Sequence, residues 1–415
     1  VQSTSASAVG LNGDSVGVVD VSDNGHWSLA DAGGSAQMLT VGTGGSGTLN
    51  IASGGKVDAG EVSLARWEMA TGDVNVSGEG SQLNTAEIMI AERGAGTLNI
   101  SDAAEVNTSS SATIGDVEGS VGVANVGTKG QWKIVSAGNS PQTLMIGEWG
   151  NGTLNIASEG TVTAGATTVG VNNTGVGRVN VDGVGSLLQG TTLEIGAHGD
   201  GAVTLSNEGT LALTNGSVLL GLAEGSTGSL NIGAAHEDIA AVAGHLTGTD
   251  SVEFGDGNGS LVFNHTDDSA TGYLFNPLIS GENGAVIQDA GHTVFTAENS
   301  YGGRTQVNGG TLTVASHSTT GNTGLGSSAV NIADAGTLSV TGASEATGDY
   351  TLSNALIGSG LLQVDLASAD NAFNFADTTG NAYTCTAELK NSTFDLSGDN
   401  TLALTQATLK LDAGN

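Results

Sequence analysis

The chain has 415 residues, of which 68 are Gly, 2 are Pro and 1 is Cys, and only 4% are aromatic. Such a chain holds too few aromatic side chains for a conventional globular core, yet its hydrophobic fraction of 38% is too high for a disordered protein. Nine Lys and Arg against 42 Asp and Glu give a formal charge of −33, which repels phosphate backbones and anionic lipids, so we expect no nucleic acid among the partners.

The sequence shows no sign of a membrane segment. No apolar run approaches the roughly 18 residues of a membrane span, and the first ten residues, VQSTSASAVG, lack the basic and apolar regions of a signal peptide. We therefore expect no direct membrane insertion by this fragment. The single Cys385 cannot form an internal disulfide. It is expected to be a buried or inert thiol, with an intermolecular bridge as the alternative.

A short apolar–polar–apolar triplet preceded by Gly recurs through the first 230 residues. The clearest copies are GSGTLNI at 45–51, GAGTLNI at 94–100, GNGTLNI at 150–156 and STGSLNI at 226–232. With the looser copies between them, successive triplets lie 24 to 30 residues apart. Asn50 and Asn155 occupy equivalent positions 105 residues apart, so four units form a longer repeat that was duplicated.

Each unit consists of short strands of alternating apolar and polar residues, separated by Gly, Ser, Asn and Asp. One unit is too short to bury its own apolar face, but it suits one coil of about three short strands. The sequence therefore predicts an all-β, elongated, right-handed parallel β-helix, or β-solenoid. A propeller is the architectural alternative, but propeller repeats usually have about 40–50 residues and carry aromatic signatures that this chain lacks.

The central Asn of each triplet is expected to lie on the outside of the coil. Because side chains on a strand alternate between two faces, Leu49 and Ile51 would point inward and Asn50 outward. Stacked coils would join these Asn residues in a ladder of amide hydrogen bonds that stabilises each coil on the next. A binding role for the ladder is the alternative. Trp27 and Trp132 align with Leu positions of other units and are expected to pack in the core.

The regular spacing ends near residue 235, which predicts three parts. Residues 1–235 form a β-helix with coils of about 25 residues and the 105-residue superrepeat, 236–278 form an irregular insertion or a change of register, and 279–415 continue the β-helix.

Two parts of the sequence resemble a known family. Residues 279–316, with their central NSYGGRT and closing GGTLTV, resemble the passenger-associated transport repeat of autotransporters, and 324–340 resemble its continuation, which places that repeat at 279–340. The GTLNI units resemble the passenger domains of the diffuse-adherence and self-associating (type Va) adhesins. The resemblance implies a passenger that is secreted through the outer membrane of a Gram-negative bacterium and displayed on the cell surface. Such passengers usually avoid Cys, so Cys385 departs from the pattern.

No arrangement of residues predicts catalysis, a cofactor or a metal ion, so we expect a protein that is not an enzyme. No local grouping of Ser, His and Asp singles out a catalytic triad, and the seven His residues show no HExxH or paired spacing for zinc. The segment GDGNG at 255–259 is more typical of a turn than of a calcium loop. Nine scattered basic residues would not neutralise an acidic sugar, as a polysaccharide lyase must.

The loops that follow each apolar strand provide the candidate binding site. Stacked coils would place these loops, among them LARWEMATG at 64–72 and IGEWGNG at 146–152, along one edge. The candidate binding residues on this edge are Arg66, Trp67, Glu68, Glu92, Arg93, Asp116, Glu118, Glu148, Trp149, Asn172, Asn173 and His198. Exposed aromatic rings beside polar groups favour contact with a sugar or a protein. The two Trp rings could instead fold back over the coil.

These observations predict an adhesin whose partner is another copy of the chain on a neighbouring cell, with aggregation, biofilm formation and virulence as the consequences. Many weak contacts along a repeated edge would act together. One alternative is adhesion to a host extracellular-matrix protein or glycan through Trp67 and Trp149. The other is a structural stalk that presents a distal binding region.

Overall fold

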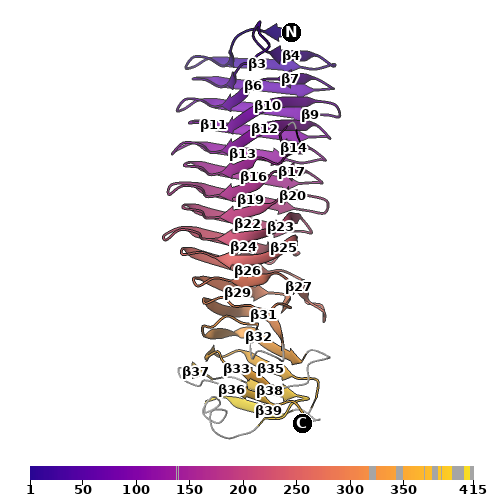
Figure 1. The fold of residues 1–415 in the computed structure, drawn as a ribbon, viewed down its shortest axis with the longest axis vertical. Coiled ribbons are helices and arrows are strands. Elements are labelled where there is room, and N and C mark those ends of the chain that lie inside the picture. The colour runs from indigo at the N-terminus through magenta and orange to yellow at the C-terminus, as the bar shows by residue number, and fades with distance from the viewer. Residues whose placement is uncertain are drawn as a thin grey trace. The chain divides into compact units, whose positions relative to one another are not determined.

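The computed structural model describes residues 1–136, 138, 140–316, 324–342, 349–368, 370–375, 382–384, 386–394 and 406–411. The regular structure in these ranges consists of strands that pair in parallel (Figure 1), which confirms the predicted all-β, parallel β-solenoid. Within the same ranges, no helix is long and apolar enough to cross a membrane. Cys385 lies outside the described residues, so its predicted role is not addressed by the structure.

The chain divides into two compact units. Unit 1 comprises Val1–Leu230 and Gly244–Thr249, and unit 2 comprises Asn231–Ala243 and Asp250–Asn415. The segment at 236–278, predicted to be an insertion or a change of register, includes much of strand β25 (His245–Phe254) together with β26 (Asn258–Asn264) and β27 (Tyr273–Phe275).

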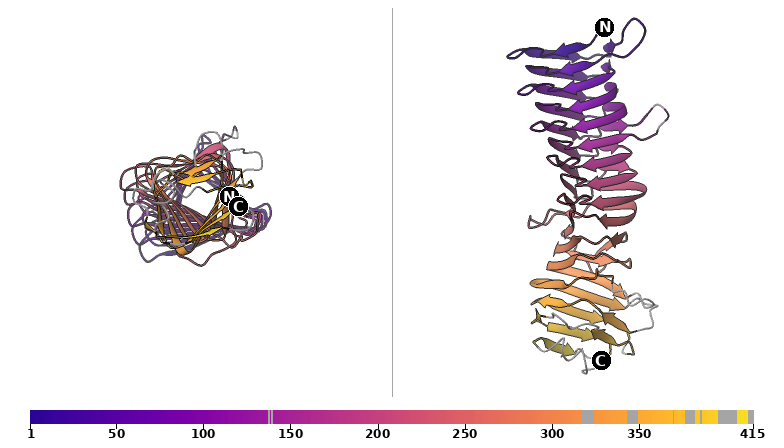
Figure 2. Two further views of the ribbon diagram at one scale, coloured as in Figure 1. Left: turned by 90° about the horizontal axis from the view of Figure 1, so that it is seen from below. Right: turned by 60° about the vertical axis from the view of Figure 1, so that its left-hand side comes forward.

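Unit 1 has three strand faces, and the coils stack in register on each face (Figure 2). The first face carries the Asn triplets and consists of β3 (Val16–Val21), β6 (Ser46–Ala52), β9 (Thr71–Ser77), β11 (Ala95–Ser101), β13 (Val121–Val126), β16 (Asn151–Ala157), β19 (Val176–Asp182), β22 (Asp200–Ser206) and β24 (Thr227–Gly233). The second face consists of β1 (Gln2–Ser3), β4 (His26–Leu29), β7 (Lys56–Asp58), β14 (Gln131–Ile134), β17 (Thr161–Thr163) and β20 (Leu187–Gly190). The third face consists of β2 (Ser7–Val9), β5 (Leu39–Val41), β8 (Glu61–Leu64), β15 (Thr143–Ile146), β18 (Ala166–Val169) and β21 (Thr192–Ile195). Three longer strands run through the second and third faces: β10 (Gln82–Ile90), β12 (Glu105–Ile114) and β23 (Thr210–Leu220).

The predicted Asn ladder is present on the outside of unit 1. Leu49 and Ile51 are fully buried, whereas the Asn50 amide donates a 2.7 Å hydrogen bond to Asp20. The ladder continues with amide-to-amide bonds of 2.8 to 2.9 Å through Asn75, Asn99, Asn125, Asn155 and Asn180. Every amide donates toward the N-terminal end, where a carboxylate accepts the last bond. A charged acceptor strengthens such a bond, so Asp20 favours the common direction in which the ladder amides donate their hydrogen bonds.

Glycine residues allow the sharp corner between the third and first faces. The corner after β12 begins at Gly115, which has a φ of 74°, and Gly122, the second residue of β13, lies against it. A Cβ on Gly122 would lie 2.4 Å from the carbonyl oxygen of Ile90 in the preceding coil. The close packing of backbones at this corner explains why Gly precedes each Asn triplet in the sequence.

Trp132 and Trp27, both predicted to pack in the core, are buried to different extents. Trp132 is fully buried, and its indole N–H donates a 3.1 Å hydrogen bond to Thr108, which confirms the prediction. Trp27 is half-buried, and its indole N–H donates to Ser3 at 2.9 Å. Trp27 pairs with Val57, which pairs with Leu83, so the aligned positions share one column of the second face.

Unit 2 has the same parallel ladders but an aromatic core. One ladder joins β26, β29 (Gly284–Ala290), β31 (Arg304–Ser316), β32 (Val330–Gly342), β34 (Leu356–Gly358) and β37 (Ala382–Tyr383). A second ladder joins β27, β30 (His292–Phe295), β31, β32, β35 (Leu361–Asp365), β38 (Thr386–Lys390) and β39 (Thr408–Leu411). The remaining pairs are β25 with β28 (Leu278–Ser280), and β33 (Tyr350–Leu352) with β36 (Phe373–Phe375). The rings of Phe263, Phe275 and Phe295 contact one another inside, with centroids 5.1 to 6.0 Å apart.

Candidate functional site

The predicted loops stack on one another in unit 1, and we call their column the turn edge. It comprises residues 42–45, 65–70, 91–94, 115–120, 147–150, 170–175, 196–199 and 221–226. Backbone hydrogen bonds join successive turns: the Trp67 N–H donates to the Thr43 carbonyl at 3.1 Å, and the Trp149 N–H donates to Asp116 at 3.0 Å. The His198 N–H continues the pattern by donating to Val171 at 3.1 Å. The alignment made from the sequence is therefore confirmed.

Both Trp side chains on the turn edge are exposed. Trp67 has 55% of its surface exposed and Trp149 has 46%. The Trp67 ring also rests on the preceding turn, because a Cβ added to Gly44 would lie 3.0 Å from its Cε3 atom. The Trp67 ring thus folds back over the neighbouring turn, as one of the two alternatives expected, and its other side still faces solvent.

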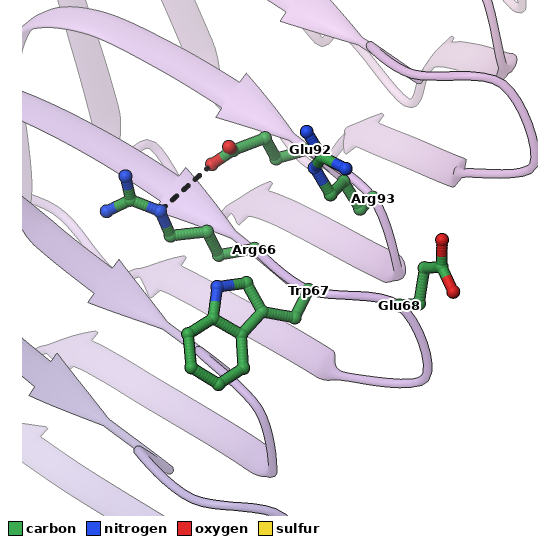
Figure 3. A pocket seen from close by; sticks show the side chains of 5 residues that line it. All are labelled: Arg66, Trp67, Glu68, Glu92 and Arg93. Carbon is green, nitrogen blue, oxygen red and sulfur yellow. Dashed lines mark ion pairs between the residues drawn. The ribbon is translucent and has the colours of Figure 1, made fainter.

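A depression of about 510 Å³ lies between two turns and is lined by Arg66, Trp67, Glu68, Glu92 and Arg93 (Figure 3). The guanidinium of Arg66 and the ring of Trp67 lie on the same side of their turn, whereas Glu68 points away from them. Arg66 Nε is 3.7 Å from Glu92 Oε2, and the Ser63 hydroxyl donates to the same oxygen at 2.6 Å. The charge of Arg66 is therefore balanced within the edge.

A second depression, of about 470 Å³, shares Glu68 and Arg93 with the first. Its lining includes Glu68, Met69, Arg93, Glu118 and Val121. Arg93 is exposed and makes no ion pair within the described part of the chain, although Glu68 and Glu118 line the same depression. The carboxylates of Glu68, Glu92 and Glu118 make the two depressions unsuitable for a polyanionic ligand, although Arg66 and Arg93 line them.

Carboxyl groups on consecutive turns meet at Asp116 and Glu148. Burial raises the pKa of Asp116, and the negative charge of Glu92 raises it further. Burial also raises the pKa of Glu148, followed by the charge of Asp116 and a hydrogen bond between the two carboxyl groups. Two carboxyl groups can form such a bond only when one of them is protonated. The turn edge therefore binds a proton more readily than free carboxylates would.

The remaining predicted residues lie on the turn edge without joining these clusters. Glu118, Asn173 and His198 are exposed, while Asn172 is half-buried and its N–H donates to the Glu148 carbonyl at 2.9 Å. Among the described residues, no group of three His, Cys, Asp or Glu side chains is arranged to hold a metal ion.

Two exposed apolar residues, one on the turn edge and one directly beside it, were missed from the sequence. Met69 has 96% of its surface exposed, and Val121 is exposed at the start of β13. Met69 lies in the same nine-residue loop as Trp67, so its position was a usable signal. Val121 faces outward by strand alternation, because it lies four residues before the ladder residue Asn125.

Comparisons with known proteins give relatives but no family model, since none matches this chain. The chain is 41% identical to "Uncharacterized lipoprotein YdeK" of Escherichia coli (strain K12) over 514 aligned positions, which cover 99% of this chain and 39% of that protein. It is 26% identical to "Uncharacterized protein YuaQ" of the same strain over 294 positions, covering 68% of this chain and 20% of that protein. A crystal structure of a TibC-catalyzed hyper-glycosylated TibA55-350 fragment aligns over 99% of this chain and 97% of that chain, with 13% identity and a TM-score of 0.40. The chain thus spans 39% and 20% of the lengths of the two curated relatives.

Proposed function

We propose that this chain is part of a bacterial surface adhesin and that its turn edge binds another copy of the chain on a neighbouring cell. The observation that carries the proposal is a gathering of exposed apolar side chains: Trp67, Met69 and Trp149 lie on stacked turns of one edge, and Val121 lies directly beside them. An exposed apolar cluster rimmed by charges is characteristic of a protein-binding surface. The solenoid repeats these turns at a fixed spacing, so the edges of two copies can meet at several points.

The charges on the turn edge suit such a contact. Arg93 is exposed and makes no ion pair within the described part of the chain, so a single carboxylate of a second copy, such as its exposed Glu118, can pair with it. The formal charge of −33 opposes close approach over about 8–10 Å at physiological salt. Each contact is therefore weak, and adhesion depends on many displayed copies, whose combined strength can exceed that of a single contact by about 10² to 10⁴. Aggregation and biofilm formation follow from this multivalency.

We also propose that the chain is an autotransporter passenger displayed on the outer surface of a Gram-negative cell, where it binds and does not catalyse. The parallel β-solenoid and the resemblance of residues 279–340 to a passenger-associated transport repeat support this placement. A second candidate function is adhesion to a host matrix protein or glycan. The exposed rings of Trp67 and Trp149 favour it, because half-exposed aromatic rings bind sugars and protein surfaces.

A bead assay tests the homotypic proposal. Beads coated with the chain should clump, soluble chain should inhibit the clumping, and added salt should strengthen it by screening the net charge. Trp67→Ala combined with Trp149→Ala should disperse the beads, whereas the control Val184→Ala should not, because Val184 is 67% exposed but lies outside the turn edge.

Two outcomes separate the proposals. Undiminished clumping of the double Trp variant, with unchanged melting, contradicts the assignment of the turn edge. Wild-type beads that stay dispersed at every salt concentration contradict homotypic adhesion, and a screen of matrix proteins and glycans then tests the second candidate.

A further inference from the structure

Unit 2 contains a groove that the proposed adhesion does not use. It has a volume of about 600 Å³, within the range typical of small-molecule sites, and lies over strands β30, β31, β32 and β35. We call it the hydroxyl groove, after its lining by Ser269, His292, Thr311, Thr313, Ser339 and Gln363.

The floor of the hydroxyl groove consists of recessed hydroxyl groups held in register. Val294, Thr313, Ser339 and Gln363 pair successively across four parallel strands, so their side chains form one outward-facing column. Thr313 and Ser339 nevertheless have only 7% of their surface exposed. The Ser339 hydroxyl lines the groove and makes no hydrogen bond to another described side chain. A recessed hydroxyl group without a partner is available to a ligand.

A loop at 266–272 forms one wall of the groove and is fixed in place. His292 Nδ1 lies 2.8 Å from the Ser269 carbonyl oxygen, and this oxygen can only accept, so Nδ1 carries the proton. In the neutral ring, Nε2 then accepts from the Thr313 hydroxyl, 2.8 Å away. This arrangement leaves the oxygen of Thr313 free to accept a further hydrogen bond. The Gly272 N–H donates to Ser269 Oγ at 3.2 Å and closes the loop.

The lining determines the kind of ligand that fits. Hydroxyl groups donate and accept, as do the hydroxyl groups of a sugar, whereas a charged ligand would require an opposite charge. The described lining has no Lys or Arg, and its one carboxylate, Asp268, is exposed. The groove lies over the middle of a sheet, where strand hydrogen bonds are already made, so it does not offer a free edge to an extended peptide.

We propose that the hydroxyl groove binds a short segment of a neutral oligosaccharide, independently of the turn edge. The recessed hydroxyls of Thr313 and Ser339 and the amide of Gln363 would contact the ligand, and His292 positions both Thr313 and the loop wall.

The test is titration calorimetry of the full chain with neutral tetrasaccharides of β-1,4-linked glucose, α-1,4-linked glucose and α-linked mannose, with tetragalacturonate as the anionic control. We expect at least one neutral sugar to bind with an affinity that does not change with salt, and the anionic sugar not to bind. Thr313→Val with Ser339→Ala removes two hydroxyl groups and should weaken binding about tenfold or more. The matched control is Thr351→Val with Ser260→Ala, on strands outside the groove, which should bind as the wild type does.

Hydrogen exchange of the unmodified chain gives a second measurement that needs no variant. Bound sugar should slow exchange in β31 and β32 and leave the turn edge unchanged. The proposal is overturned if no neutral sugar binds at millimolar concentration or if the groove variant binds as tightly as its control. It is also overturned if bound sugar slows hydrogen exchange in strands other than β31 and β32. Bead clumping plays no part in this assay, so the outcome is independent of the proposed adhesion.

Discussion

The buried His265 should make the stability of unit 2 depend on pH. Its ring is fully buried, its Nε2 lies 2.9 Å from the Thr293 hydroxyl oxygen, and its Nδ1 has no hydrogen-bond partner among the described residues. Burial lowers the pKa of His265 to about 4. An unfolded His has a pKa of about 6.5. As the pH falls, the unfolded chain therefore takes up a proton on His265 before the folded chain does. The free energy of unfolding of unit 2 is thus highest above about pH 6.5 and declines below it.

The size of the effect follows from the two pKa values. Integrating the difference in bound protons gives a loss of about 2.5 kcal/mol in the free energy of unfolding of unit 2 by pH 4.5. Asp267 and Glu388 also have lowered pKa values, chiefly through hydrogen bonds from Ser269 and Lys410 respectively. Their contribution is lost only below the usual carboxyl range of about 4, so His265 is expected to dominate between pH 6.5 and 5.

The chain provides separate probes for its two units. All four Trp residues lie in unit 1, and all four Tyr residues lie in unit 2. Urea unfolding of the full chain, followed by Trp fluorescence and by near-ultraviolet Tyr signals, should show the Tyr midpoint falling between pH 7 and 5. His265→Gln keeps a polar group beside Thr293 without the charge, so its midpoint should stay level over this range. A wild-type Tyr midpoint that is constant, or an equal decline in the Gln variant, would refute the reasoning.

Three further predictions concern unit 1. Glu148→Gln removes a half-buried charge, and because its pKa is raised in the fold, the variant should be more stable than the wild type at pH 7 and lose this advantage below about pH 4 in urea unfolding. Asn99→Ala breaks two ladder bonds of 2.8 Å and should lower the unfolding free energy by about 1–3 kcal/mol; an unchanged midpoint would contradict a structural ladder. Gly122→Ala places a methyl group 2.4 Å from a backbone oxygen and should lower the melting temperature by several degrees, whereas Gly13→Ala, in open space, should not.

Much of unit 1 could be predicted from the sequence because its fold is nearly one-dimensional. A coil contacts mainly the coils before and after it, so a fixed repeat length places Asn50 beside Asn75 without knowledge of any distant contact. Strand alternation assigned Leu49 to the core and Asn50 to the surface. The stacking of the loops into one edge followed from the same repeat, which is why the candidate residues Trp67 and Trp149 were placed on it correctly.

The tertiary structure decided which side chains meet and how far each is exposed. The carboxyl groups of Asp116 and Glu148 interact because their turns are adjacent in the stack, although the two residues are 32 positions apart in the chain. Thr313 and Ser339 occupy ordinary outward positions of their strands, and only the loop wall and neighbouring rungs make them the floor of a groove. Repeat length and alternation fix the position of a residue along and across the coil. Burial, charge pairing and cavities depend on the surrounding side chains and loops, which these periodic patterns do not specify.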